Sequence, residues 1–550
     1  MPIDHVVVLV LENRSFDHML GFLRHPDRRF EGLAGSGPYD NPGWDGGPRV
    51  AATPAAKAVL PFGPDHSHDA VMAQLGATGS GAGRTVTNQG FVSSYERKGR
   101  GLAQATFGGF LAPLIRLLGI GGKPAVVVEG RGPLVMLCQA PDQVPVLSRL
   151  ALEFAVCDHW FCSVPGETWP NRNFLHAATS DGETNIVVRP YTDPTIFELL
   201  EKNNKSWRIY HDDTPQVWAF PRLWDSPERH GNWFPAAKFA VHVSEGDLAA
   251  YSFIEPNHRP PVHTVDVDPN TPGLSTSQHP ENNLVPNDTY DTHDSGQDSD
   301  FARGEALIAG VYEALRANPE LFARTLLLIT YDEHGGLYDH VPPPTDAPNP
   351  GHPKSALGRL LDAILHRRAR PFDFTLLGPR VPAVIVSPLI PTGTLDNRIH
   401  DHASVPSTIR TIFAPQALPL TARDKTAIPF HDVATLVQPR TNLPDLSGFT
   451  RATMTSLTST VTETSEPIEP SPDTTELTTE QTPHYYDDFI NQAEAVRKHL
   501  DEVGEPEIKP ISAAKPATTQ LAAEVTIAFA KAAHRHRHTT GRADTTISSE

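Results

Sequence analysis

Two pairs of polar residues with the oxygen atoms that metal ions prefer follow apolar segments of the chain. Glu12-Asn13 comes directly after residues 3–11, and Asp332-Glu333 comes after residues 326–330 and one tyrosine. Carboxylate and amide oxygens are the usual ligands of hard divalent cations. Adjacent acids before a Gly-Gly pair are also common in polar turns, so neither pair alone defines a site. Two such pairs beside a suitable nucleophile predict a site for one cation and a phosphate group.

Thr168 is the candidate nucleophile. It stands in the segment 166–173 (GETWPNRN), where a proline two residues later precedes a run compatible with a helix. This pattern predicts a helix N-cap at Thr168, and that structural role alone would account for the residue. The N-terminus of a helix also binds anions, because its free N–H groups point at the ligand. A hydroxyl placed there could attack a bound phosphate once a base or a metal lowers its pKa.

Four apolar runs predict the buried strands that would position these residues. They are residues 3–11, 152–156, 326–330 and 381–386, and each closes on polar residues. Continuous Val, Ile and Leu runs are typical of parallel strands covered on both faces, and helical patterns such as 306–318 and 405–413 lie between them. In open α/β sheets, ligands bind beyond the carboxyl ends of the strands. The sequence therefore predicts an α/β fold with its chemistry at those polar ends.

Charge and cysteine content narrow the class of protein. Of 550 residues, 39% are hydrophobic, which suffices for a large core, and the formal net charge is -19. This charge excludes a broad nucleic-acid surface, since phosphate backbones require a basic face, whereas a buried cation could still hold a phosphorylated substrate. Three cysteines are a poor disulfide framework. The N-terminus lacks a basic region and no segment is apolar enough to span a bilayer, which predicts a cytoplasmic protein or export by a signal-independent route.

Changes in composition divide the chain into three parts. Residues 1–445 predict the catalytic domain, residues 446–483 a disordered linker rich in Thr, Ser, Glu and Pro, and residues 484–550 a short helical tail of unknown role. Within the first part, residues 259–299 are dense in Pro, Asp, Asn and His and predict a long surface excursion. Residues 101–133 are apolar and punctuated by glycine. They predict either an insert packed on the core or a lid that borders the substrate entrance and makes peripheral contact with a membrane.

Four motifs occur in order along the chain: ENRSFDH (12–18), PNR (170–172), YDEHGGLYDHVPPP (331–344) and DHASVPS (401–407). As a set they resemble the phosphatidylcholine-type phospholipase C and acid phosphatase family, which includes bacterial phospholipases C and plant non-specific phospholipases C. The resemblance covers roughly residues 3–430. It implies a metal-dependent hydrolase of phosphoric esters, with an alkaline-phosphatase-like α/β sandwich built on a mostly parallel central sheet flanked by helices.

The resemblance also implies roles for individual residues. A divalent metal ion would be held by Glu12, Asn13, Thr168, Asp332 and Glu333. Thr168 would attack phosphorus and form a phosphothreonine, with proton transfers assigned to His66 and to His293 or His279. Five further residues match family motifs and would contact the substrate or support the site: Arg172, Asp339, His340, Asp401 and His402.

Two positions depart from the family pattern. Gly63 stands where the histidine motif usually has an aspartate, and Asp65 lies two residues further on. Glu167 stands directly before the nucleophile, where proline or a small residue is usual. Its carboxylate would repel a phosphate unless Arg172 or a cation compensates the charge, so the substrate preference could differ from that of the family.

These residues are compatible with three functions. The first is a phospholipase C that cleaves the phosphodiester of a glycerophospholipid, and the second is a broad-specificity acid phosphatase that acts on phosphomonoesters. Sulfatase chemistry is disfavoured, because it requires a Cys or Ser that is oxidised to formylglycine and this chain has Thr168. An inactive binding or scaffold protein is the remote alternative, because the nucleophile and all four acidic or amide ligands are present.

Overall fold

An eight-stranded sheet forms the centre of the protein. The computed structural model describes residues 3–35, 37–57, 60–107, 130–187, 191–212, 215–223, 227–258, 275–283, 300–351 and 372–450. The strand order is β11 (Thr394–Asp396), β4 (Ala155–Cys157), β10 (Ala383–Val386), β9 (Thr325–Tyr331), β1 (His5–Leu11), β8 (Tyr251–Ile254), β6 (Trp207–His211) and β7 (Trp233–Pro235). Neighbouring strands are parallel except where β10 meets β9 and β4. The sheet is therefore mostly parallel, as predicted.

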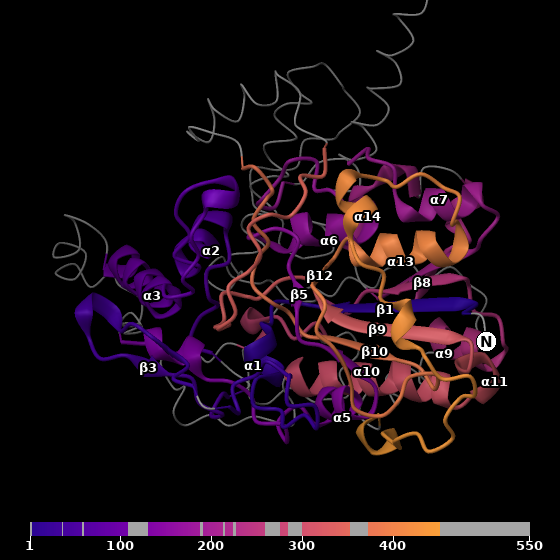
Figure 1. The fold of residues 1–550 in the computed structure, drawn as a ribbon, viewed down its shortest axis with the longest axis horizontal. Helices are drawn as coiled ribbons and strands as arrows, with labels where there is room; N and C mark the ends of the chain where they lie inside the picture. The colour runs from indigo at the N-terminus through magenta and orange to yellow at the C-terminus, as the bar shows by residue number, and fades with distance from the viewer. Residues whose placement is uncertain are drawn as a thin grey trace, which may run out of the picture.

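Helices cover both faces of this sheet (Figure 1). One face carries α6 (Thr168–Ala177), α7 (Ile196–Lys202), α13 (Ser404–Phe413) and α14 (Ala422–Thr426). The other carries α5 (Pro145–Glu153), α9 (Lys238–Ser244), α10 (Asp300–Arg316) and α11 (Pro319–Phe322). The chain thus forms three layers, which confirms the predicted α/β class.

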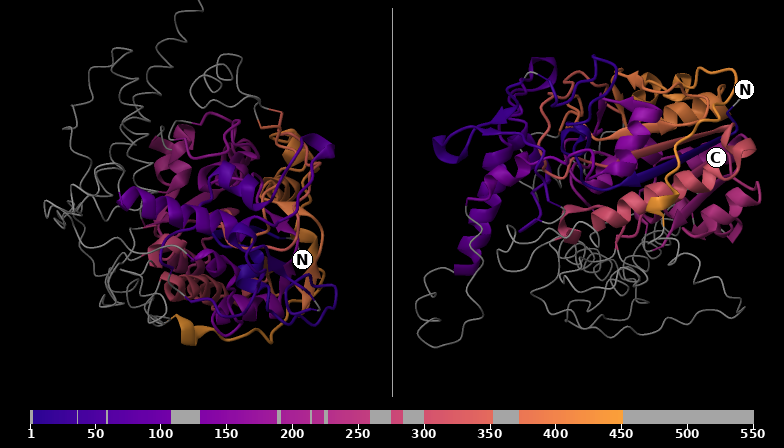
Figure 2. Two further views of the ribbon diagram at one scale, coloured as in Figure 1. Left: turned by 90° about the vertical axis from the view of Figure 1, so that its left-hand side faces the viewer. Right: turned by 90° about the horizontal axis from the view of Figure 1, so that it is seen from below.

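Smaller elements gather beyond the carboxyl ends of the parallel strands. Here lie α1 (Phe16–Leu20), α2 (His68–Gln74), α3 (Phe91–Phe107) and the strand pair β2 (Asp40–Asn41) and β3 (Val50–Ala51). In Figure 2, α3 projects from this edge of the molecule. A second strand pair joins β5 (Trp160–Phe161) to β12 (His400–Asp401). The short helix α8 (Pro227–His230) precedes β7 in the chain. Segments far apart in the sequence therefore meet at the edge where ligands bind in α/β sheets.

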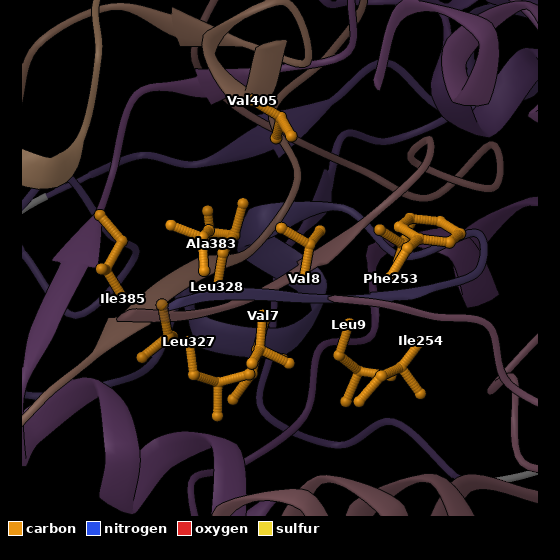
Figure 3. Packing of buried hydrophobic residues seen from close by; sticks show 14 of the residues in the cluster. Val7, Val8, Leu9, Phe253, Ile254, Leu327, Leu328, Ala383, Ile385 and Val405 are labelled. Carbon is orange, nitrogen blue, oxygen red and sulfur yellow. The ribbon is translucent and has the colours of Figure 1, made fainter. Parts of the chain in front are cut away.

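The core explains why the central strands are apolar throughout. Every residue of β9 is buried, as is β1 from its second residue onward. In Figure 3, Val8 and Phe253 point toward Val405 of α13, whereas Val7 and Leu9 point to the opposite face. Because successive side chains alternate between faces and helices cover both, neither strand has a solvent face that would favour polar residues.

Two strand predictions are corrected by the structure. The run 381–386 forms β10, but β10 is antiparallel to both of its neighbours, so Ser387 after it lies at the opposite edge from Asp332. Continuous apolar sequence indicates burial and carries no information on strand direction. The run 152–156 is divided, because Leu152 belongs to α5 and the strand begins at Ala155.

The predicted surface excursion 259–299 is wrong for the part that the structure describes. Ser277 and Gln278 are fully buried. Their carbonyl oxygens accept hydrogen bonds from the Glu12 N–H at 2.9 Å and from Arg14 Nε at 2.8 Å, so this polar segment forms part of the interior.

Several predictions fall outside the described residues. These are the centre of the apolar insert (108–129), the segment 284–299 that contains His293, and all residues after 450, including most of the predicted linker and the tail. Leu446, the first residue of the predicted linker, packs in the main core. Across the described ranges, no helix combines the length and the apolar character needed to cross a bilayer.

Candidate active site

The two polar pairs, Glu12-Asn13 and Asp332-Glu333, lie side by side at the carboxyl edge of the sheet. β1 and β9 are neighbours, and Leu11 is in register with Tyr331, so each strand delivers its pair at the same level. The Asn13 N–H donates to Asp332 Oδ1 at 3.0 Å. All four side chains are buried: Glu12, Asn13, Asp332 and Glu333. The structure thus brings together residues that are 319 positions apart in the sequence.

Thr168 lies in the first turn of α6, beside Asn13 of the first pair. Its Oγ1 donates to Asn13 Oδ1 at 3.5 Å, and only 2% of the residue is exposed. The predicted N-cap is corrected, because Thr168 is the first helical residue and Glu167 occupies the cap position. The Thr168 hydroxyl therefore does not cap the helix. It lies beside the free N–H groups at the start of α6, where an anion binds well.

Arg172 lies one turn further along α6 and is fully buried. Its Nε donates to Asp332 Oδ2 at 3.0 Å and its Nη1 to Glu255 Oε1 at 2.9 Å. The guanidinium therefore fixes Asp332 and compensates part of the acidic charge. Its ion pairs within the described residues are with Glu12, Glu255 and Asp332, while the Glu167 carboxylate accepts the N–H of Ile186.

Two histidines meet at Asn13. Its Nδ2 lies 2.9 Å from His279 Nε2 and 3.5 Å from His66 Nε2. Burial works to lower the pKa of His66, but the carboxylates of Glu333 and Glu167 outweigh it and raise this pKa above its usual value. Burial, together with the charge of His66, holds the pKa of His279 well below its usual value. The pKa values of the two imidazoles are thus shifted in opposite directions, and His66 is the one whose protonated form the surrounding carboxylates favour.

The acidic residues fit a hard divalent cation. Burial raises the pKa of Glu12 to about 7 and that of Glu333 to about 8. Among the described residues, Glu333 Oε1 is buried without any hydrogen-bond partner. A cation beside these buried carboxylates would stabilise their charged form, and the carboxylate and amide oxygens of the two pairs are the ligand type that Mg²⁺ and Ca²⁺ take.

Asp339 and His340 form a separate buried cluster with Asp17. His340 Nδ1 lies 2.6 Å from Asp17 Oδ2, and Arg380 donates to both Asp17 and Asp339 at 2.9 Å. These groups lie close enough to bind a metal, but the Arg380 guanidinium already supplies the positive charge. A second compact group, formed by Cys157, Asp396 and His400, is likewise satisfied by Arg398, which donates to both oxygens of Asp396.

Replacing Arg380, the positively charged partner of Asp17 and Asp339, should destabilise the fold. Arg380→Met leaves the carboxylates of Asp17 and Asp339 buried without their partner, which costs about 3–5 kcal/mol of unfolding free energy. Urea unfolding measures this loss. Arg29→Met is the control, because Arg29 pairs with Asp27 at the surface and its loss should cost less than about 1 kcal/mol. Equal midpoints for the two variants would contradict the role given to Arg380.

Asp401 and His402 support the site from outside it. His402 Nδ1 accepts from Trp160 Nε1 at 3.2 Å, so its Nε2 carries the proton and donates to the Asp332 carbonyl oxygen at 2.6 Å. Asp401 is paired with Arg423 at 2.6 Å. His402 thus holds the backbone directly after β9 in place, whereas Asp401 accepts hydrogen bonds from Arg423 and from Ser163 Oγ.

Glu255 is a site residue that the strand prediction missed. It follows β8, whose four residues include Ser252 and are too few to stand out as an apolar run in the sequence. It anchors Arg172 and also accepts the N–H of Gln216 at 2.9 Å. The segment 251–258 (YSFIEPNH), which is also similar to the family, is the local signal that could have indicated it.

Buried acids, a hydroxyl at a helix start and an imidazole beside them are groups suited to the hydrolysis of an ester of phosphoric acid. The chain belongs to the phosphoesterase family, because the model described as "Phosphoesterase family" matches residues 3–415. It is accordingly a hydrolase that acts on phosphoric esters.

Similar proteins include non-specific phospholipases C of Arabidopsis thaliana. Non-specific phospholipase C6 is 34% identical over 459 residues, covering 80% of this chain and 74% of the relative. Non-specific phospholipase C3 is 31% identical, covering 80% and 75%. Phospholipase C B of Mycobacterium tuberculosis is 26% identical, covering 77% and 76%. The plant and bacterial relatives therefore match over most of their own length.

Solved structures show only a remote likeness. Phosphonate monoester hydrolase from Silicibacter pomeroyi is 12% identical with a TM-score of 0.30, covering 55% of this chain and 73% of that structure. A protein in the alkaline phosphatase superfamily from Vibrio parahaemolyticus is 12% identical with a TM-score of 0.27, covering 49% and 60%.

Proposed function

We propose that this chain is a phospholipase C that hydrolyses the phosphodiester of a glycerophospholipid through a phosphothreonine at Thr168. The observation that carries the proposal is the 3.5 Å contact between Thr168 Oγ1 and Asn13 Oδ1, at the edge where two strands present buried acids. The similarity to plant and bacterial proteins named phospholipase C supports a lipid substrate. Such a substrate is presented at a lipid surface, so the enzyme would act in peripheral contact with it.

Five residues would hold the divalent cation: Glu12, Asn13, Thr168, Asp332 and Glu333. When bound, the cation would lower the pKa of the Thr168 hydroxyl and balance the charge of the phosphoryl oxygens. Arg172 holds Asp332 at 3.0 Å and so fixes one of these groups before substrate arrives. The first N–H groups of α6 would orient the phosphate against Thr168.

His66 would carry out the proton transfers. In the first displacement, the Thr168 alkoxide bonds to phosphorus and the bond to the diacylglycerol oxygen breaks. His66, whose pKa is raised, donates the proton that the leaving oxygen takes up. In the second, water bonds to phosphorus and gives its proton to His66, and the bond to Thr168 breaks. The phosphorylated head group leaves and Thr168 returns to its initial state.

Substrate turnover separates this function from its alternatives. Purified protein should convert phosphatidylcholine to diacylglycerol and phosphocholine, and a chelator should abolish the reaction. Turnover of a chromogenic phosphomonoester without any attack on phosphatidylcholine would identify a phosphatase instead. No turnover of either substrate after metal is added back would favour the binding or scaffold function.

A further inference from the structure

Gln74 joins three segments that surround the candidate active site. It is the last residue of α2 and is 1% exposed. Its Nε2 donates to the Asp65 carbonyl oxygen at 2.6 Å and to Ser94 Oγ of α3 at 3.2 Å. Its Oε1 lies 2.8 Å from His334 Nε2. One buried amide thus links the loop before His66, helix α3 and the turn after β9.

These contacts determine the tautomer of His334. The Asp65 carbonyl can only accept, so the amide NH₂ of Gln74 faces it and Oε1 faces the imidazole. His334 Nε2 therefore carries the proton and donates it to Gln74. The bare Nδ1 lies 3.3 Å from Glu333 Oε2. Since this nitrogen offers no proton, His334 leaves the charge of Glu333 available for a cation.

The packing around two glycines shows how closely the same segments approach. Gly335 and Gly336 have φ values of +66° and +71°, a conformation that other residues rarely adopt. A Cβ at Gly336 would lie 2.7 Å from Pro64 Cβ and 2.8 Å from the Asp65 carbonyl oxygen. The turn that carries Glu333 is therefore pressed against the loop that carries His66, with the Gln74 amide beside the contact.

We propose that Gln74 is a positioning residue for the reaction, because it holds the His66 loop against the Glu333 turn at the separation that catalysis requires. This inference rests on the proposed function of the site. Gln74 reaches neither Asn13 nor Thr168 in any hydrogen bond of the described residues, so it acts through His66 and His334. Without these hydrogen bonds the proposed metal ligands would remain, but His66 would no longer be held in position beside the leaving group.

Gln74→Met tests the proposal, because methionine keeps the shape and removes all three hydrogen bonds. We expect kcat on a soluble phosphodiester to fall about 10–100-fold with little change in KM, as is typical for residues that orient a reacting group. Gln139→Met is the matched control. Gln139 is 2% exposed, and its Nε2 has no hydrogen-bond partner among the described residues. That variant should keep its kcat.

A double variant with His66→Ala distinguishes positioning from stability. If Gln74 acts through His66, the two losses in kcat should not multiply, because an absent imidazole cannot be misplaced. If the losses multiply, or if Gln74→Met loses no more kcat than Gln139→Met, the proposal is overturned.

Two further variants complete the test. Should Gln74→Met fail to fold, Gln74→Glu keeps the acceptor for His334 and replaces the donor group. It should then show an intermediate loss of kcat that again does not multiply with His66→Ala, and multiplying losses would overturn the proposal. Thr168→Ala tests the underlying function separately. An active Thr168→Ala rejects the site itself, whereas an inactive one beside an unaffected Gln74→Met rejects only the role of Gln74.

Discussion

Replacing Thr168 by alanine is expected to abolish turnover while leaving the fold intact. The loss should reach about 10³–10⁶-fold, because the alkoxide that attacks phosphorus is removed. The cost in unfolding free energy should stay below about 1 kcal/mol, since Glu167 and not Thr168 occupies the cap position of α6. Turnover of a soluble chromogenic phosphoester and the melting temperature measure these two effects independently.

Two further variants give this experiment its controls. Thr179→Ala removes a threonine that is also 2% exposed and whose Oγ1 accepts the Asp181 N–H at 3.1 Å, and it should retain full activity. Thr168→Ser keeps the hydroxyl and should retain part of the turnover. A Thr168→Ala variant that still turns over substrate near the wild-type rate would show that the hydroxyl is only structural.

The sequence could place both polar pairs, Glu12-Asn13 and Asp332-Glu333, because their strands are buried on both faces. A run such as residues 6–11 has no polar position, so its burial and its end are both visible without a structure. The carboxyl-edge rule then brings Glu12 and Asp332 together, and the register of Leu11 with Tyr331 confirms that they meet. Local pattern and a general topological rule were enough for this part of the site.

What the sequence could not supply is the pairing of polar groups across the fold. Residues 275–283 have the composition of a surface loop, yet Ser275, Ser277 and Asn282 are buried because they hydrogen-bond one another. The direction of β10 depends on its neighbours and leaves no local trace. The bonds of Gln74 join segments up to 260 residues apart, so no spacing could reveal them.

Loss of Glu333 is expected to remove bound metal and activity together. Glu333→Gln removes the charge of a buried carboxylate that follows β9 and whose Oε1 has no hydrogen-bond partner among the described residues. Residues that only support metal ligands already cost 10–100-fold when lost, so a ligand itself should cost about 100-fold or more. Metal analysis of the purified variant, beside its turnover, measures both quantities. Exhaustive chelation of the wild type should have the same effect on turnover, reversed when a divalent cation is added back.

Glu305→Gln is the matched control for this second experiment. Glu305 is also buried, burial raises its pKa to about 7, and its Oε1 likewise has no hydrogen-bond partner among the described residues, while its Oε2 accepts the N–H groups of Val146 and Leu147 at the start of α5. Its replacement should lower the melting temperature slightly and leave the metal content of the protein unchanged. If the loss of a buried carboxylate were itself the cause, metal content and turnover would fall equally in both variants. If a cation binds at the strand ends, they fall only in Glu333→Gln. Purified wild type that contains no metal, with turnover untouched by chelation, would show that these buried acids serve the reaction in another way.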